Sequence, residues 1–336
     1  MCATSIRAAE PRLALRAFPS PRRLLPQAMT EVTASAPASG AATLTGMLAI
    51  LLWAGLALLT AASGEAPPFE LAALTFSIGG ALGLVFAAAR GRLASLAQPW
   101  PVWLVGVGGL FGYHALYFAA LRRAPPAQAS LIAYLWPLLI VLFSALLPGE
   151  RLTIRHIAGA LTGFAGAVIL FAGRGALALS SDGAALSGYA LALCCAFVWS
   201  GYSVLSRRLK AAPTEAVAGF CLATAALAGL CHFVFETTVL PANPGQWAAI
   251  VGLGLGPVGL AFYVWDFGVK HGDIRLLGIA AYGAPVLSTL ILVAAGVARP
   301  TWPLAFACGL IVAGALVASW PPSGQEKGRR EAGLLD

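Results

Sequence analysis

Charged residues are scarce in this chain. Lys and Arg number 21 and Asp and Glu 13 among 336 residues, against 59% hydrophobic residues and a mean hydropathy of +0.84. A soluble domain cannot bury so large an apolar fraction, so the bilayer must be the main solvent of the chain. The stretches between the apolar runs are short, which leaves no room for a separate soluble domain.

Ten apolar stretches are long enough to cross a membrane. A hydrocarbon core of roughly 30 Å takes about 20 residues of helix. We therefore predict an all-α integral membrane protein with ten transmembrane helices, at 43–62, 69–89, 101–121, 127–147, 153–172, 185–205, 213–235, 247–268, 276–296 and 301–320.

The net charge of +8 does not indicate a nucleic-acid partner. If both termini are cytoplasmic, 17 of the 21 Lys and Arg residues fall on the inner side, and only Arg122, Arg123, Arg174 and Arg299 fall on the outer side. This asymmetry follows the positive-inside rule. No basic patch interleaved with aromatic residues remains, so we expect a multi-pass protein with the bilayer as its partner and no nucleic acid.

The chain also lacks metal and disulfide motifs. Five of its six cysteines fall in predicted spans, and no two form a Cys-x-x-Cys pair. Buried free thiols behave as small hydrophobic groups. We expect no structural disulfide, no metal site and no cofactor.

Carboxylates are missing where a cation exporter would need one. The predicted span 43–62 has none, which argues against antiport of protons and cationic drugs. No span carries Lys or Arg near its middle, so a phosphate ester would have no counter-charge. A neutral or zwitterionic solute remains. We expect Asp266 to lie near the cytoplasmic end of its span and to form a surface ion pair with Lys270, one turn on, rather than to relay protons.

Two short sequences are repeated. Ala-Tyr-Leu-Trp-Pro at 133–137 returns as Ala-Tyr-Gly-Ala-Pro at 281–285, and Trp-Ala-Gly at 53–55 returns as Trp-Ser-Gly at 199–201. The copies of each pair are five spans apart, an odd number, so the second copy crosses the membrane in the opposite sense. Inverted repeats are typical of secondary transporters.

The repeats divide the chain into segments. We predict two inverted five-helix repeats at 43–172 and 185–320, joined by a periplasmic linker at 173–184. Residues 1–42 are predicted to be a disordered cytoplasmic segment in which Met29 is an alternative start, and residues 321–336 a cytoplasmic tail.

Aromatic and polar residues inside the spans are the candidate binding residues. Tyr113 and Tyr117 lie four residues apart, hence on one helix face with His114 at its edge. Together with Tyr134 they would suit a cavity for a small solute that has an apolar body and polar ends. The alternative is that the same residues form a packed aromatic core.

Two prolines are expected to break helices. Pro137 and Pro285 occupy equivalent mid-span positions, where each removes an amide donor and frees the carbonyl four residues back, at Ala133 and Ala281. In transporters such breaks mark hinges or a binding site near the membrane midplane. A static kink is the alternative.

The residues around Pro137 resemble a known family. Gln-Ala-Ser-Leu-Ile-Ala-Tyr-Leu-Trp-Pro at 128–137, followed by Pro-Gly-Glu-Arg-Leu at 148–152, is similar to the fourth helix and next loop of the EamA-type exporters of the drug/metabolite transporter superfamily. With Gly-Tyr-His-x-x-Tyr at 112–117, the pattern looks most like the YddG aromatic amino acid exporters. The resemblance covers about residues 43–320.

The resemblance implies a ten-helix transporter of the bacterial inner (plasma) membrane that exports amino acids or related metabolites by alternating access. The expected substrate-binding residues are Trp53, Tyr113, His114, Tyr117, Tyr134, Trp136, Trp199 and Tyr282, with helix breaks at Pro137 and Pro285. The second repeat has Gly283 and Ala284 where the first has Leu135 and Trp136, so the site should lie toward the first repeat's third and fourth helices.

We therefore predict a monomeric exporter of aromatic and other apolar amino acids that works by downhill facilitation. A multidrug or other small-metabolite exporter of the same fold is the alternative. An intramembrane enzyme would need a nucleophile and a base within reach. His114 is the only deep histidine and no serine lies in a Gly-x-Ser-Gly setting, so we predict no enzyme and no catalytic residues.

Overall fold

A computed structural model of the chain describes residues 39–173, 177, 179–296 and 299–320. The segment predicted to be disordered lies almost wholly outside the described residues, as do the tail at 321–336 and part of the linker at 173–184. The first helix begins at Gly40, three residues before the predicted boundary.

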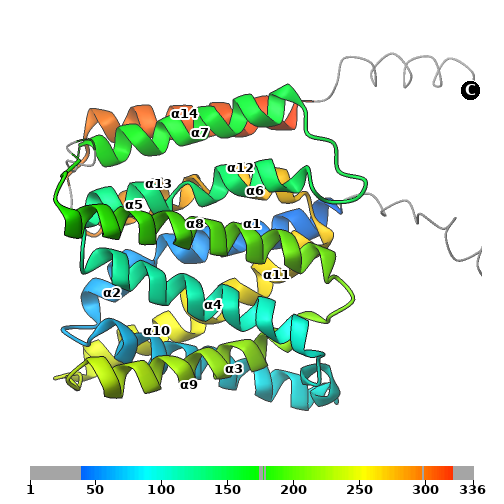
Figure 1. The fold of residues 1–336 in the computed structure, drawn as a ribbon, viewed down its shortest axis with the longest axis vertical. Coiled ribbons are helices and arrows are strands. Elements are labelled where there is room, and N and C mark those ends of the chain that lie inside the picture. Colours follow the sequence, from blue (N-terminus) through cyan, green and yellow to red (C-terminus); the bar gives the residue numbers. More distant parts are fainter. Residues whose placement is uncertain (1–38, 174–176, 178, 297–298, 321–336) are drawn as a thin grey trace, which may run out of the picture. The chain divides into compact units, whose positions relative to one another are not determined.

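The described residues form helices and their connections, and ten helical segments are long and apolar enough to cross a membrane (Figure 1). This confirms the predicted all-α membrane fold. The ten segments are α1 (Gly40–Ala54) with α2 (Leu56–Ala62), α3 (Pro68–Ala89), α4 (Trp100–Leu121), α5 (Pro126–Ala133) with α6 (Trp136–Ser144), α7 (Ile154–Ala172), α8 (Gly183–Arg208), η3 (Thr214–Ala216) with α9 (Val217–Phe235), α10 (Pro244–Leu255) with η4 (Gly256–Leu260) and α11 (Ala261–His271), α12 (Ile274–Ala280) with α13 (Gly283–Ala294), and α14 (Trp302–Ser319). A short 3₁₀ helix, η2 (Leu93–Leu96), lies between α3 and α4.

Short sequence signals start these helices. Pro68, Pro126 and Pro244 are each the first residue of a helix, where the missing N–H would have had no partner in any case. Asp182 caps α8 by accepting hydrogen bonds from the backbone N–H groups of Ala184 and Ala185. Helix entry is therefore set locally, at the ends of the apolar runs.

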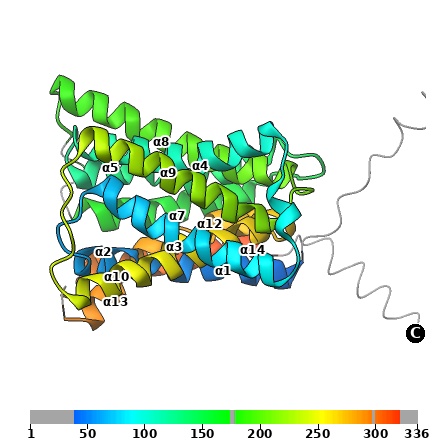
Figure 2. The same ribbon diagram turned by 90° about the horizontal axis from the view of Figure 1, so that it is seen from below.

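The two halves pack in matching pairs. The fifth span, α7, packs along the tenth, α14, and the second, α3, along the seventh, α9 (Figure 1). The third span with the sixth, α4 with α8, matches the eighth with the first, α11 with α1. In the view of Figure 2, α4, α8 and α9 lie on one side and α1 and α10 on the other. Two inverted halves produce such pairs, because each contact of a span in one half is matched by a contact of the equivalent span in the other half.

Glycine allows the tightest of these contacts. A Cβ on Gly314 of α14 would lie 2.6 Å from the carbonyl oxygen of Gly159 in α7, so the two backbones could not approach as they do with any larger residue. Such close contact replaces the hydrophobic effect as the source of helix association in lipid.

Candidate functional site

Four of the ten spans are interrupted near their middle. The first bends at Gly55, between α1 and α2, and the fourth breaks at Tyr134 and Leu135, between α5 and α6. The eighth contains a π-helical turn, η4, and the ninth breaks at Ala281 and Tyr282. Non-helical backbone is tolerated at membrane depth only where protein or a cavity surrounds it, so these breaks indicate where a site can lie.

Pro137 and Pro285 lie just after the breaks. Pro137 is the second residue of α6 and Pro285 the third residue of α13, positions in a first turn where proline disturbs no helical hydrogen bond. The break therefore falls before each proline. The carbonyl of Ala281, expected to be free, instead accepts a hydrogen bond from the N–H of Ala284 at 3.1 Å, because the chain tightens into a turn there.

The two breaks are joined by Tyr282. Its hydroxyl accepts a hydrogen bond from the backbone N–H of Leu138 at 3.1 Å. That N–H lies in the first turn of α6, where helical amides have no partner within the helix. A side chain from the second repeat therefore satisfies a backbone group exposed by the break in the first.

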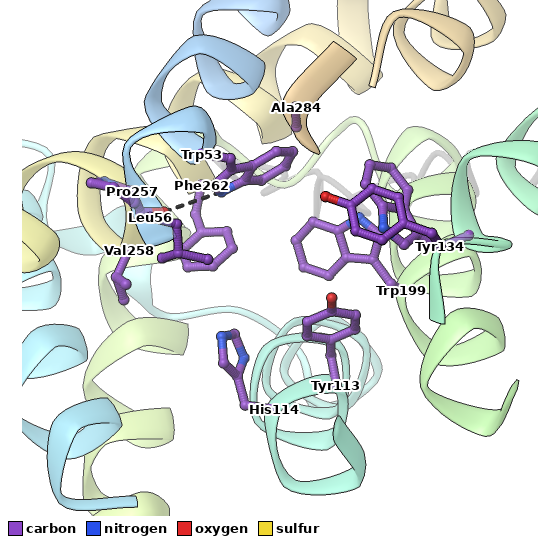
Figure 3. A pocket seen from close by; sticks show the side chains of 11 residues that line it. Trp53, Leu56, Tyr113, His114, Tyr134, Trp199, Pro257, Val258, Phe262 and Ala284 are labelled. Atoms are coloured by element: carbon purple, nitrogen blue, oxygen red, sulfur yellow. Dashed lines mark hydrogen bonds between the residues drawn. The ribbon is translucent and has the colours of Figure 1, made fainter. Parts of the chain in front are cut away.

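A cavity of about 110 Å³ lies between the interrupted spans (Figure 3). Six of the eight expected binding residues line it: Trp53, Tyr113, His114, Tyr134, Trp136 and Trp199. Further lining comes from Leu56, Pro257, Val258, Phe262 and Ala284. Typical small-molecule pockets have roughly 300–1,000 Å³. A solute as large as an aromatic amino acid would thus enter only if wall side chains or helices move.

Three tryptophan rings, of Trp53, Trp136 and Trp199, form part of the wall. The ring centroid of Trp53 lies 5.7 Å from that of Trp199 and 6.2 Å from that of Trp136, and both pairs meet edge to face. This is a favoured geometry for aromatic pairs. The indole N–H of Trp53 donates to the carbonyl oxygen of Pro257 in η4 at 3.1 Å, which ties the first span to the π-helical turn of the eighth.

His114 faces the cavity beside Tyr113 (Figure 3). Its Nδ1 lies 2.7 Å from the carbonyl oxygen of Leu110. A carbonyl only accepts, so Nδ1 must carry the proton, and Nε2 of a neutral ring is then an acceptor. The ring packs edge-on against Phe76 at 5.0 Å, which holds its orientation.

Two expected residues, Tyr117 and Tyr282, are not in the cavity lining. Tyr117 stands behind Tyr113, with the two rings stacked at 6.0 Å, and its hydroxyl bonds the Ser130 hydroxyl at 2.8 Å. Tyr282 is fully buried between the break and α7, close to Gly163. Both lie outside the lining of this cavity, and their part in substrate binding stays a prediction.

The eighth span supplies a wall residue, Phe262, and a residue packed behind the wall, Trp265, neither of which was predicted from the sequence. Phe262 lines the cavity and stacks on Phe76 at 5.5 Å, and Trp265 lies 5.1 Å from Trp53. An offset of 148 residues, the spacing of the Tyr-x-x-Pro copies, carries His114 onto Phe262 and Tyr117 onto Trp265. The repeat itself was the signal that could have found them.

Buried groups close one end of the cavity. One turn beyond Phe262 and Trp199, Trp265 donates from its indole N–H to the hydroxyl of Ser203 at 3.1 Å, and both residues are fully buried. Farther along α11, Asp266 and Lys270 form an ion pair at 2.8 Å. Solute could leave toward this end only if these groups separate.

The Asp266–Lys270 pair is buried, so the expectation of a surface ion pair is wrong. Asp266 is 1% exposed and Lys270 6%, because α11 is covered here by α8 and η3. Thr214 donates to the same carboxylate at 2.8 Å, and Lys270 donates to the carbonyl of Ala212 at 2.9 Å. A buried pair needs such additional bonds to offset its desolvation.

A second ion-pair group lies at the end of the helices on this side. The carboxylate of Glu150, in the loop after α6, contacts Arg207 of α8 at 2.6 Å and Arg275 of α12 at 3.3 Å. Arg207 also donates to the carbonyl oxygens of Val269 and Gly272 at 2.9 and 2.7 Å. We call Glu150, Arg207 and Arg275 the inner clasp, since they join the first repeat to the second.

Comparison with known proteins shows which family and which relatives this chain resembles. The model of the EamA-like transporter family matches residues 40–172 and again residues 186–320. The aromatic amino acid exporter YddG of Ancylobacter novellus is 60% identical over 280 residues, which cover 83% of this chain and 96% of that protein. The exporter of the same name from Salmonella typhimurium is 26% identical over 260 residues, 74% of this chain and 87% of that protein.

A solved structure has the same fold. A crystal structure of a protein 60% identical in sequence superposes with a TM-score of 0.79, covering 83% of this chain and 97% of that chain. Together with the double family match, this confirms the resemblance inferred from the residues around Pro137 and the division of the ten helices into two halves.

Proposed function

The chain belongs to the EamA-like transporter family, and we propose that it is a secondary transporter that exports aromatic amino acids across the bacterial inner membrane. The observation that carries this proposal is the cavity walled by Trp53, Trp136 and Trp199 at the level of four helix breaks. The 60% identity to a YddG aromatic amino acid exporter supports it.

The cavity wall offers groups for each part of an amino acid. The faces and edges of the tryptophan and tyrosine rings suit an aromatic side chain, and ring faces also attract an ammonium group. Nε2 of His114 can accept a hydrogen bond from that ammonium. The N-termini of α6 and α13 reach the cavity at Trp136 and Ala284, and the positive end of a helix favours a carboxylate.

The repeats supply a means of transport. We propose that residues 43–172 and 185–320 rock against each other, with the segments before Pro137 and Pro285 as hinges and the inner clasp opening as solute enters. The placement of 17 of 21 Lys and Arg residues supports cytoplasmic termini, which puts the clasp on the cytoplasmic side. No residue in the cavity lining is acidic, which supports downhill transport. We propose that a single chain carries it out, since both halves of the site come from the same chain.

The test is counterflow in proteoliposomes made with the purified full chain. We expect labelled phenylalanine, tyrosine and tryptophan to exchange with internal unlabelled substrate, and aspartate and lysine to exchange much more slowly. The same amino acids should raise the thermal unfolding midpoint in the same order, because a ligand stabilises the state that it binds. Equal rates for all amino acids, or exchange of none, would overturn the proposal.

A further inference from the structure

A second cavity lies away from the aromatic site. Its volume is about 700 Å³, and it opens where α7 begins and α14 ends, beside the start of α12. Of the residues that line it, only Arg275 belongs to the inner clasp that the transport mechanism uses. The lining residues are Arg151, Thr153, Ile154, Arg155, His156, Asp273, Arg275, Leu276, Ala318, Ser319 and Trp320.

Positive charge dominates the lining. It holds the guanidinium groups of Arg151, Arg155 and Arg275 against the single carboxylate of Asp273. Arg275 is neutralised, since it contacts both Asp273 and Glu150 at 3.3 Å. Within the part of the chain that the structure describes, Arg151 forms no ion pair. Arg155 donates to the backbone carbonyl oxygen of Trp320 at 3.1 Å, which leaves its positive charge in the lining.

The helix terminus beside the cavity is not itself an anion site. Thr153 and His156 form a reciprocal cap, in which the N–H of Thr153 donates to Nδ1 of His156 at 3.2 Å and the side chain of Thr153 bonds the backbone of His156. This satisfies the N–H groups of Thr153 and His156, two of the donors at the start of α7. An anion would therefore be held by the arginine side chains, whose planar donors match phosphate oxygens.

The rim of the cavity is apolar on its outer side. Ile154 is 76% exposed and Trp320 is 70% exposed, and both stand at the ends of predicted spans. Tryptophan at such a position is typical of the membrane interface. Along the same two helices Leu161 and Leu316 are also exposed, so apolar side chains are available to acyl chains along α7 and α14.

We propose that this cavity holds the headgroup of an anionic glycerophospholipid, with its phosphate on Arg151 and its acyl chains along α7 and α14. A basic cavity lining next to exposed apolar side chains fits an amphiphile, whereas a free phosphate ion would contact only the basic lining. Basic pockets between helices on the cytoplasmic side are known sites for anionic headgroups. The proposal relies on the orientation given above only for the choice of leaflet.

Thermal unfolding of the purified full chain in zwitterionic nanodiscs provides the test. We expect phosphatidylglycerol to raise the unfolding midpoint at least twice as much as added phosphatidylcholine. Native mass spectrometry should show retained phosphatidylglycerol. Arg151→Gln should remove at least half of the excess shift, and Arg151→Lys should keep most of it. Arg208→Gln is the matched control, because Arg208 is an exposed arginine at the same end but on α8.

Three results would overturn the proposal. An equal response to the two lipids would remove any preference for negative charge. An equal shift from inorganic phosphate would assign the cavity to a free anion. A preference seen only in a chain that ends at Trp320 would mean that residues 321–336, which include Glu326 and Glu331, occupy the cavity in the full chain. None of these results depends on transport, so the proposed function can stand or fall separately.

Discussion

At the scale of single residues, the structure separates side chains that face the solute from those that hold the wall. Trp136 does both, since it lines the cavity and is almost wholly buried among Trp53, Trp199 and Trp265. Truncation of a buried tryptophan costs about 3–5 kcal/mol in soluble proteins. Loss of transport in Trp136→Ala would therefore not identify a binding residue by itself.

His114 allows a cleaner experiment. It is half-buried, and His114→Ala removes the acceptor Nε2 while leaving the tryptophan wall in place. We expect the apparent affinity for phenylalanine in counterflow to fall about tenfold, roughly 1.4 kcal/mol, with little change in the unfolding midpoint. Tyr117→Phe is the control, because Tyr117 is outside the lining and loses only its bond to Ser130. Equal loss of affinity in both variants would contradict the assignment of His114 to the site.

Tyr134 and Tyr282 occupy equivalent positions in the repeat, and their replacement by Phe should affect stability and substrate affinity in opposite proportions. Tyr282→Phe leaves the N–H of Leu138 without its acceptor, and an unsatisfied buried donor costs about 1–3 kcal/mol. We expect a lower unfolding midpoint with nearly unchanged substrate affinity. Tyr134→Phe, in the cavity lining, should change affinity more than stability. Unfolding curves and ligand titrations on both variants measure this, and the same pattern in both would refute it.

At the scale of helices, much of the structure could be predicted and some could not. The lengths of the apolar runs fixed the ten spans, and Pro137 and Pro285 located two breaks to within three residues. The π-helical turn at Gly256–Leu260 was not expected, because Pro257 and its glycines resemble ordinary packing residues in an apolar run. The prediction that Asp266 lies at the surface was wrong for a related reason. Burial depends on neighbouring helices, and the sequence of one span does not contain them.

The inner clasp makes a prediction about helix movement. The side chains of Arg207 and Glu150 are only 10% and 13% exposed, and removing one partner of a buried pair costs up to about 3–5 kcal/mol. We expect Glu150→Gln to favour opening at this end. A Ser203→Cys probe, at a fully buried position on the closed path, should then be modified at least ten times faster by a soluble maleimide.

The matched control for the clasp is Glu215→Gln. Glu215 pairs with Arg92 at 2.8 Å, but Arg92 is 60% exposed, and such surface pairs contribute about 0–1 kcal/mol. Labelling of the Ser203→Cys probe should stay at its original rate. If Glu215→Gln accelerates labelling as much as Glu150→Gln, the effect is general loosening and the clasp has no special part in closure.

At the scale of the whole molecule, the pairing of the helices connects symmetry to transport. Both halves contribute to the cavity, since Trp53, His114 and Trp136 come from the first and Trp199 and Phe262 from the second. A site shared in this way changes its access when one half moves against the other. The divergence of Trp136 and Ala284 at equivalent positions leaves the wall more aromatic on the side of the first half.

The surroundings of Asp266 bear on whether proton movement drives transport. Proton coupling through a carboxylate would need an acid that can release its partner, and Asp266, one turn beyond the cavity residue Phe262 on α11, is a buried acid. It is held by both Lys270 and Thr214, so we interpret the pair as structural. We expect a pH gradient of one unit to change the initial rate of phenylalanine transport by less than twofold.

Variants of the pair extend this test. Asp266→Asn leaves the ammonium of Lys270 buried without a counter-charge, so we expect a strongly lowered unfolding midpoint. Asp266→Asn with Lys270→Met removes both charges and should recover most of that loss along with transport. If the unmodified chain accumulates phenylalanine against its gradient when a pH gradient is imposed, and the double variant does not, then Asp266 couples proton movement to export and the structural interpretation fails.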